Sequence, residues 1–455
     1  MQTQCKQNEL QFQDLGRKKV IVKNDGERTS SDGGLIILRE IEEKRRIIER
    51  FSECFNDGRK QEKITHSLLN LLKQRIFGIC LGYEDVNDHE QWRYDPMLAF
   101  CCNKDQDTVL AGKSTLNRME LPVISEKDRR YKKINYDSEA IRELFIKVFT
   151  ESYETEPEEI ILDLDATDDP LHGEQEGRFF HGYYDEYCYL PLYAFVGEHL
   201  LLADLLKADT DPGNQSISRL RYLIYKIREV WPDVRIIVRA DSGFCRNAIM
   251  SFCESQDNVD YILGLKGNSI LKRAMGNAVE VVKKEYKESG CKQKIFREIR
   301  YKTKKSWSKK RRVIGKAEYS SLGENTRFVV ASFDETEYSG QALYEDLYCG
   351  RGNMENRIKE QQLYLFADRT STHYIDSNQL RLWLSSLAYV LFVILRNAGL
   401  ASTDLDRAQV DTIRLKLLKV SALVKESCRR IFIRIPESFP YWNIWIAIRK
   451  NLCAI

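Results

Sequence analysis

One stretch organises the chain: Ile160-Ile161-Leu162-Asp163-Leu164-Asp165-Ala166-Thr167-Asp168-Asp169-Pro170, an apolar run that leads into a cluster of carboxylates. The apolar half predicts a buried β-strand, and the acidic half predicts the polar turn that ends it. Carboxylates at the end of a buried strand are costly unless they bind a positive partner. Mg²⁺ is the usual partner, because it takes one or two carboxylates and leaves positions for phosphate oxygens. The alternative is an Asx-rich turn whose acids are solvated.

Strands and helices alternate around this stretch, over residues 138–290. The predicted elements are strands at 187–196, 200–206, 234–240 and 261–265, and helices at 213–230 and 247–255. The first two strands are joined at Gly197-Glu198-His199 and should therefore pair antiparallel. The strand 234–240 ends at a second acid, Asp241. The order β-β-β-α-β-α-β predicts an α/β fold, in which an open mixed sheet carries helices on its faces.

A third carboxylate lies much later in the chain. A pair of glycines predicts a helix start near Asn353, which places Glu355 in the first turn. Adjacent strand ends and a packed helix can bring Asp165, Asp241 and Glu355 into one crevice. Three clustered carboxylates do not all stay ionised unless cations neutralise them. Two Mg²⁺ ions about 3.5–4 Å apart would neutralise them and support an in-line phosphoryl displacement.

A strongly basic run follows the alternating region. Between Lys292 and Lys316 there are twelve Lys and Arg residues and a single acid, with aromatic residues interleaved. The pattern predicts a β-ribbon that continues to Ser332. A run of charges is usually a solvated face, but the single sign and the aromatics favour a surface for DNA phosphates. The candidate DNA-binding residues are Lys304, Lys305, Lys309, Lys310, Arg311 and Arg312.

The bulk composition bounds the class of protein. A chain of 455 residues requires two or three domains, and its net charge of +3 means that DNA binding can be argued only from local clusters. The twelve cysteines form no CxxC pair, which predicts free thiols in a reducing compartment and hence a cytoplasmic protein. The longest apolar run, 382–395, is short for a membrane span and predicts a buried helix, so no membrane is expected.

Both ends of the chain predict helices with interspersed basic residues. Residues 1–137 contain helical patterns over about 36–56, 60–81 and 84–95, which suggests a DNA-binding and assembly region. A helical support domain is the alternative for this region. Residues 401–455 have the character of a basic amphipathic helix.

The two strand-end aspartates and the helical glutamate together resemble the ribonuclease-H-like core of DDE transposases. The spacing Tyr348-x2-Arg351-x3-Glu355 resembles the signature around the catalytic glutamate in a large class of bacterial insertion sequences that carries a β-rich insertion. Several longer sequence motifs, spread over most of the chain, resemble those of one insertion-sequence family, the "thirteen-eighty" group. These motifs are Leu162-Asp163-Leu164-Asp165-Ala166-Thr167-Asp168-Asp169-Pro170, His172-Gly173-Glu174-Gln175-Glu176-Gly177, Arg239-Ala240-Asp241-Ser242-Gly243-Phe244 and Glu355-Asn356-Arg357-Ile358-Lys359-Glu360.

The resemblance implies how the chain is divided. It implies a ribonuclease-H-like mixed sheet as the catalytic core over 138–267 and 341–400, interrupted by a basic β-rich insertion over 268–340. The helical regions 1–137 and 401–455 flank this core.

The resemblance also implies the roles of individual residues. It makes Asp165, Asp241 and Glu355 the catalytic acids that hold two Mg²⁺ ions, for which Mn²⁺ may substitute. Tyr348 and Arg351 match residues that contact DNA phosphates near the scissile bond. The family signature has Lys or Arg seven positions after the glutamate, where this chain has Gln362; Lys359, one helical turn from Glu355, is the candidate substitute.

The identity of the first acid is open from geometry alone. Side chains two apart on a strand share a face, so Asp163 and Asp165 point to the same side. The resemblance favours Asp165, because the family class places Ser or Thr two positions later, here Thr167.

The activity that the resemblance implies is DNA transposition. It consists of hydrolytic nicking, release of the element, and attack of its 3′-hydroxyl on target DNA. The partner is double-stranded DNA, both the terminal inverted repeats of the element and the target, and the joining of two ends implies a homodimer on DNA.

Two other functions compete with this interpretation. The spacing Asp163-x-Asp165-x-Thr167 after an apolar strand is also the nucleophile motif of haloacid-dehalogenase-type phosphatases, in which the first Asp attacks phosphate. Such a fold needs a lysine, for which Lys266 could serve, and a later acidic pair that the sequence does not supply. The second alternative is a domesticated DNA-binding protein that keeps the fold without catalysis.

Overall fold

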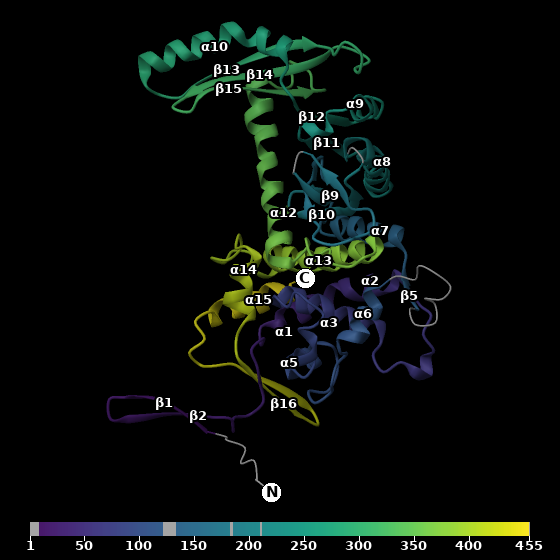
Figure 1. Cartoon of the computed structure of the whole chain (residues 1–455), viewed down its shortest axis with the longest axis vertical. Coiled ribbons are helices and arrows are strands. Elements are labelled where there is room, and N and C mark those ends of the chain that lie inside the picture. The colour runs from purple at the N-terminus through teal and green to yellow at the C-terminus, as the bar shows by residue number, and fades with distance from the viewer. Residues whose placement is uncertain (1–8, 122–132, 183–184, 210–211, 455) are drawn as a thin grey trace.

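One large mixed β-sheet forms the upper part of the computed structural model (Figure 1), which describes residues 9–121, 133–182, 185–209 and 212–454. Its strands run in the order β10-β9-β6-β11-β12-β15-β14-β13, with two short strands, β7 and β8, also paired to β9. The bounds are β6 Glu159–Ala166, β7 Asp169–Pro170, β8 Phe179–His181, β9 Glu186–Val196, β10 His199–Lys207, β11 Arg235–Ala240, β12 Val259–Leu265, β13 Gln293–Tyr301, β14 Arg311–Ser320 and β15 Gly323–Ala331.

The centre of this sheet is parallel and its flanks are antiparallel. β11 pairs in parallel with β6 on one side and β12 on the other, whereas β9 and β10 form the expected antiparallel hairpin. The predicted order of strands and helices is therefore confirmed. The basic ribbon is also confirmed, but β13, β14 and β15 continue the same sheet through an antiparallel pairing of β15 with β12.

The two faces of the sheet carry different helices, because the side chains of each strand alternate. Leu162 and Leu164 of β6 pack in the core under the helices of one face. Those helices are α7 Ser138–Thr150, α8 Pro212–Val230, α9 Asn247–Cys253 and α10 Ser269–Ser289. Helix α10 was not predicted from the sequence; it precedes the ribbon strands and packs on β13 and β14. The opposite face, to which Asp163 and Asp165 belong, is covered by a different helical segment.

That segment is a long helical rod that runs from the sheet to the rest of the molecule (Figure 1). It consists of α11 Gly340–Ala342, the π-helical turn η4 Leu343–Tyr348, the 3₁₀ turn η5 Cys349–Arg351 and α12 Gly352–Leu365. Leu343, Tyr344 and Leu347 pack against Ile237 of β11 and Ile262 of β12. The predicted helix start near Asn353 is confirmed, and the rod places Glu355 over the sheet.

The rod ends on α13, Ile375–Ile394, the apolar helix that the sequence predicts to be buried. Among the described residues, only the helical segment 375–399 is long and apolar enough to cross a membrane, and most of it is buried inside the fold. Helices from both ends of the chain pack around α13 in one core. These are α1 Leu35–Arg45, α2 Ile47–Glu53, α3 Leu68–Leu81, α4 His89–Trp92, α5 Pro96–Cys101, α6 Lys113–Glu120, α14 Val410–Ile413 and α15 Trp442–Cys453, with the short turns η6 Leu395–Gly399 and η7 Arg414–Leu418. A further short turn, η1 Gln61–Lys63, contributes no buried residue.

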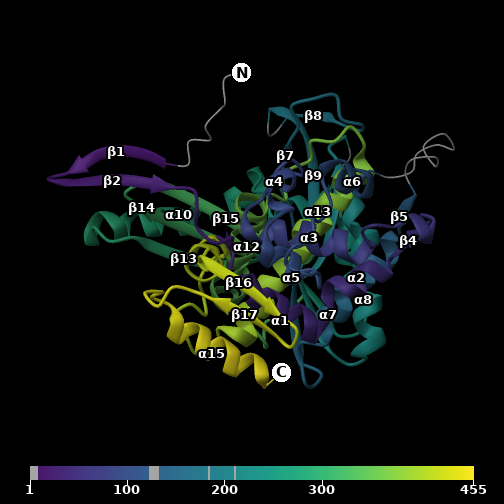
Figure 2. The same cartoon turned by 90° about the horizontal axis from the view of Figure 1, so that it is seen from below.

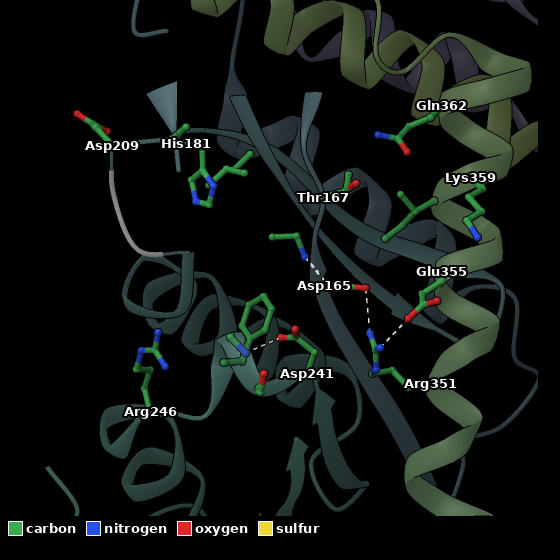
Figure 3. A pocket seen from close by; sticks show the side chains of 17 residues that line it. Asp165, Thr167, His181, Asp209, Asp241, Arg246, Arg351, Glu355, Lys359 and Gln362 are labelled. Carbon is green, nitrogen blue, oxygen red and sulfur yellow. Dashed lines mark hydrogen bonds and ion pairs between the residues drawn. The ribbon is translucent and has the colours of Figure 1, made fainter. Parts of the chain in front are cut away.

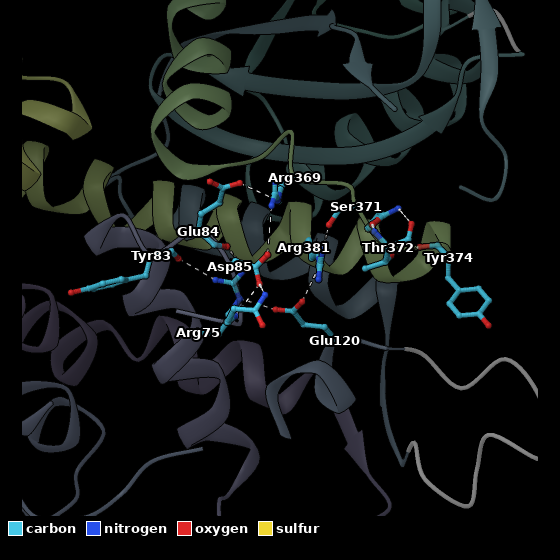
Figure 4. Close-up of polar contacts among 12 residues, drawn as sticks. Arg75, Tyr83, Glu84, Asp85, Glu120, Arg369, Ser371, Thr372, Tyr374 and Arg381 are labelled. Atoms are coloured by element: carbon cyan, nitrogen blue, oxygen red, sulfur yellow. Dashed lines mark hydrogen bonds and ion pairs between the residues drawn. The ribbon is translucent and has the colours of Figure 1, made fainter. Parts of the chain in front are cut away.

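Together with α13, these helices form the helical body of the molecule. Buried ion pairs hold its amino-terminal helices against α13 (Figure 4). Glu120 of α6 is fully buried and accepts hydrogen bonds from Arg75 of α3, at 2.7 Å, and from Arg381 of α13, at 2.8 Å. Removing one member of such a group leaves an uncompensated buried charge. The amino-terminal helices are therefore integral to the support of α13, and through it of α12.

The terminal regions contain strands that the sequence analysis did not predict. They are β1 Glu9–Leu15, β2 Lys18–Lys23, β3 Thr29–Ser30, β4 Phe55–Asp57, β5 Ile134–Tyr136, β16 Ala422–Ser427 and β17 Arg430–Arg434. The expectation of a purely helical region over 401–455 is wrong in this part, because β16 and β17 form an antiparallel pair to which β3 adds. β1 and β2 form a separate hairpin that projects from the body (Figure 2).

Candidate active site

The first two predicted acids lie next to each other at one edge of the sheet. β6 and β11 pair in parallel with Leu164 opposite Ala240, and each acid is the residue that follows. Neighbouring strands are about 4.8 Å apart, so this register places Asp165 beside Asp241. Asp241 also caps the short 3₁₀ turn Ser242–Phe244, where its Oδ1 accepts a hydrogen bond from the Gly243 amide at 2.8 Å.

The third predicted acid reaches the same place from the helical rod. Glu355 lies in the first turn of α12 and points toward Asp165 in Figure 3. Asp165, Asp241 and Glu355 all line one cavity of about 800 Å³. The structure thus brings together three carboxylates that are separated by up to 190 positions in the sequence, from 165 to 355.

Arg351 lies between two of these acids and bridges them (Figure 3). Its Nη1 is 3.1 Å from Oδ2 of Asp165, and its Nη2 is 2.6 Å from Oε1 of Glu355. The side chains of Arg351 and Asp165 are 19% and 15% exposed, whereas that of Glu355 is 46% exposed. A single guanidinium therefore offsets part of the negative charge of this cluster.

The electrostatics of Asp165 reflect this crowding. Burial raises the pKa of Asp165 to about 7; Arg351 opposes this rise, and the charges of Asp241 and Glu355 add to it. Burial also raises the pKa of Tyr348, which lies one turn before Arg351 on the rod. A carboxyl group with a perturbed pKa that lies in a cavity beside other acids is typical of functional sites rather than of solvated turns. The alternative of a solvated Asx turn is therefore wrong for Asp165.

The structure separates Asp163 from Asp165. Asp163 is 4% exposed, and its carboxylate is held by Arg239 of β11, with Nε–Oδ1 at 2.6 Å and Nη2–Oδ2 at 2.8 Å. It does not line the cavity that contains the other acids. A buried carboxylate with both oxygens bound to a guanidinium is not available as a nucleophile, so the phosphatase alternative loses its first residue.

The remaining predicted residues near the cavity fall into two groups. Lys359 is exposed and lines the cavity, as does Gln362, whose amide donates a hydrogen bond to the Asp168 carbonyl at 3.1 Å. Tyr348 lies in an adjoining cavity that Asp241 and Arg351 also line. Gln362 thus ties α12 to the turn after β6, a role that requires no positive charge at this position.

The six basic residues of the ribbon do not behave alike. Lys304, Lys305, Lys309 and Lys310 are exposed. Arg311 and Arg312 have side chains that are 2% exposed and are paired with Glu254 and Glu298. This geometry does not support the prediction that these two arginines bind DNA, because their buried guanidinium groups are already paired with acids within the fold.

Arg239 is a residue of the site that the sequence analysis missed. The available signal was the second arginine of the strand Arg-Ile-Ile-Val-Arg-Ala, which follows three apolar residues, because a buried charge requires a buried partner. The sequence alone did not show which of the acids would be that partner.

The carboxylates are suitable metal ligands by type, but in the present arrangement Arg351 stands between them. Within the described residues, no three His, Cys, Asp or Glu side chains are grouped so as to hold a metal ion. Oxygen donors of this kind match Mg²⁺ or Mn²⁺, and the raised pKa of Asp165 indicates that the ionised cluster requires added positive charge.

Comparison with known proteins places these features in a family. No curated protein matches the sequence. One solved structure, described as a piggyBac transposase synaptic complex with hairpin DNA, is 9% identical and has a TM-score of 0.41, with 86% of this chain and 81% of that chain covered. The model of the family "Transposase DDE domain group 1" matches residues 12–454. The chain therefore belongs to the DDE transposase domain family, group 1.

Proposed function

We propose that this protein is the transposase of a bacterial insertion sequence of the "thirteen-eighty" type. In this proposal it cleaves the ends of its element and joins their 3′-hydroxyls to target DNA. The observation that carries the proposal is the convergence of Asp165, Asp241 and Glu355 on one cavity in a member of the DDE family. The mixed sheet, with acids at two parallel strand ends, supports a ribonuclease-H-like core.

We assign the metal-binding role to the same three acids. Asp165 and Asp241 approach from neighbouring strands and Glu355 from the rod, so oxygen ligands enter the cavity from two sides. When bound there, two Mg²⁺ or Mn²⁺ ions lower the pKa of an attacking water or 3′-hydroxyl and stabilise the leaving oxygen. Arg351 binds only Oε1 of Glu355, and release of this contact would free Nη2 of the guanidinium for a DNA phosphate.

Other residues orient the DNA in this proposal. Arg351, Tyr348 and Lys359 surround the acids, so that a phosphodiester in the cavity meets cationic and hydroxyl donors. The exposed lysines Lys304 and Lys305 lie on the ribbon that extends the same sheet, and we assign them to contacts with the DNA backbone. Two element ends must be joined together, so the working form on DNA is proposed to be a homodimer.

The proposed location is the cytoplasm. Every described cysteine is a free thiol, which suits a reducing compartment. The helix α13, the long apolar segment of the chain, is accounted for by burial in the helical body.

A plasmid assay tests the catalytic assignment. The substrate is a supercoiled plasmid that carries the inverted repeats flanking the coding frame, incubated with the full-length protein and Mg²⁺. We expect nicking by the wild type and a loss of at least about a hundredfold in rate for Asp165→Asn, Asp241→Asn and Glu355→Gln, because each removes a charged oxygen ligand. Omission of Mg²⁺ should abolish nicking by the wild type.

The control is Glu288→Gln, which removes an exposed acid from α10 that is only loosely paired, at 3.9 Å, with Lys284. It should nick at the wild-type rate. Equal rates for the wild type and Glu355→Gln would refute the catalytic role of Glu355. A wild type that binds the repeats without nicking them would instead favour the domesticated DNA-binding protein.

A further inference from the structure

Arg239 and Asp163 form a buried pair, each two residues before one of the catalytic acids Asp241 and Asp165. They face each other directly across β11 and β6, and their side chains are 8% and 5% exposed. Asp165 lies two residues after Asp163, and Asp241 lies two residues after Arg239. Because side chains two apart on a strand share a face, the pair and the catalytic acids lie on the same side of the sheet.

The guanidinium of Arg239 also makes a third contact, to the helical rod. Its Nη1 donates a hydrogen bond to the carbonyl of Leu347, in the π-helical turn. The rod approaches so closely that a Cβ on Gly350 would lie 2.6 Å from this same Nη1. A side chain at this point of the rod would therefore displace the guanidinium, which connects both strands to the rod.

This contact lies on the rod shortly before the two residues of the rod that enter the site. Leu347 precedes Arg351 by four residues and Glu355 by eight, so both lie on the helical turns that follow it. π-Helical turns in helices occur often at functional sites. A displacement of the rod at Leu347 would shift Arg351 and Glu355 relative to the strand-borne acids.

We propose that Asp163 and Arg239 are positioning residues that set the place of Glu355 against Asp165 and Asp241. Asp163 fixes the orientation of the Arg239 guanidinium through two hydrogen bonds, and the guanidinium in turn fixes the position of Leu347 in the rod through a third. An ion pair is not needed merely to fill this space, because apolar residues of similar volume hold strands together equally well. The proposal deepens the function proposed above and rests on it.

The substitution Arg239→Lys separates the contacts. A lysine keeps the positive charge beside Asp163, but its single nitrogen does not reproduce the planar fork that binds two carboxylate oxygens and a carbonyl at once. Two measurements on the full chain follow the effect. Amide hydrogen exchange reports on residues 343–355, and the electron paramagnetic resonance signal of free Mn²⁺ reports metal affinity in the absence of DNA.

We expect Arg239→Lys to lose protection from exchange in residues 343–355 and to weaken Mn²⁺ binding by about tenfold, which is the effect of misplacing one ligand. The conservative variant Asp163→Glu should retain more of both properties than Asp163→Asn. The matched control is Arg311→Lys, which alters a buried arginine with a similar fork of two hydrogen bonds, to Glu254 at the end of α9, outside both the rod and the cavity. It should lower the melting temperature without changing Mn²⁺ affinity.

The outcomes separate this inference from the function on which it rests. If Arg239→Lys melts at a lower temperature but keeps wild-type Mn²⁺ affinity and wild-type exchange in 343–355, the pair is structural only and the inference is wrong. If the wild type itself binds no Mn²⁺ while Arg239→Lys loses local protection, the metal assignment fails and the tether between sheet and rod stands.

Discussion

Arg351 shows how one side chain holds an acidic site together. The guanidinium binds Asp165 and Glu355 at once, so one positive charge from within the chain partly offsets these two carboxylates. Asp165 nevertheless has a pKa raised to about 7, because burial and two neighbouring acids outweigh the effect of the arginine. The site therefore favours the addition of further positive charge, provided that Arg351 gives up its contacts.

The substitution Arg351→Ala tests this competition. We expect the DNA-free variant to bind Mn²⁺ about threefold to tenfold more tightly than the wild type, since a partly exposed ion pair is worth roughly 1 kcal/mol. Nicking should fall, because the same side chain is proposed to contact a DNA phosphate. Titration of Mn²⁺ followed by electron paramagnetic resonance measures the first effect. Weaker Mn²⁺ binding by Arg351→Ala would show that the arginine supports the metal ligands instead of competing with metal.

At the scale of single elements, the basic ribbon illustrates how like charges divide between two roles. Its exposed lysines project from a turn between β13 and β14, whereas Arg311 and Arg312 at the start of β14 are buried and paired with Glu254 and Glu298. Arg312 also donates hydrogen bonds to the carbonyls of Phe333, Asp334 and Tyr338. The two arginines thus hold β14 to its neighbours, whereas Lys304, Lys305 and Lys310 are exposed to solvent.

Substitution of the exposed lysines should weaken DNA binding without loss of stability. For the triple variant Lys304→Gln, Lys305→Gln and Lys310→Gln, we expect the dependence of log affinity on log salt to become less steep. The slope should change by about 0.9 for each DNA phosphate that the variant no longer neutralises. Fluorescence anisotropy over a series of salt concentrations measures this slope. An unchanged slope would remove these lysines from the DNA interface.

The control for this prediction is Arg311→Ala. It should lower the free energy of unfolding by about 3–5 kcal/mol, because it leaves Glu254 without its buried partner. Its effect on the salt dependence should be small as long as the variant is folded. Urea denaturation distinguishes the two kinds of change.

At the scale of the whole molecule, the helical body supports the site from below. α12 stands between the sheet and α13, and α13 is held by helices from both ends of the chain (Figure 1). The β1–β2 hairpin is the exception, because all its residues are exposed and it pairs only with itself among the described strands. One face of it carries the cross-strand apolar pairs Leu10–Val22 and Phe12–Val20.

Burial predicts a small effect on stability for one phenylalanine substitution and a large loss for another. Phe12 in the hairpin is 56% exposed, whereas Phe51 of α2 is fully buried in the helical body. We expect Phe12→Ala to change the free energy of unfolding by less than about 0.5 kcal/mol, and Phe51→Ala to lower it by about 3–5 kcal/mol. Urea denaturation of the two variants checks this. A large loss for Phe12→Ala would show that the hairpin packs against the body in solution.

Local signals in the sequence were enough to predict the central elements and to single out the three acids. Hydrophobic periodicity and turn residues are local signals, so the strand Glu159–Ala166, the strand Arg235–Ala240 and the helix start before Glu355 could all be predicted. The expectation that the three acids converge rested on the resemblance and on the tendency of parallel strand ends to share an edge. The terminal strands were missed, because short paired strands depend on distant partners more than on local pattern.

The pairing of acids with bases, in contrast, could be read only from the three-dimensional arrangement. Asp163 and Asp165 are equivalent by strand alternation, but Arg239 lies opposite Asp163 in the register, and Arg351 reaches Asp165 from the rod. Likewise, nothing local distinguishes Arg311 from Lys310, which differ in whether a buried acid faces them. Charge pairing is set by atoms that are distant in sequence and adjacent in space, and burial multiplies its strength by excluding water.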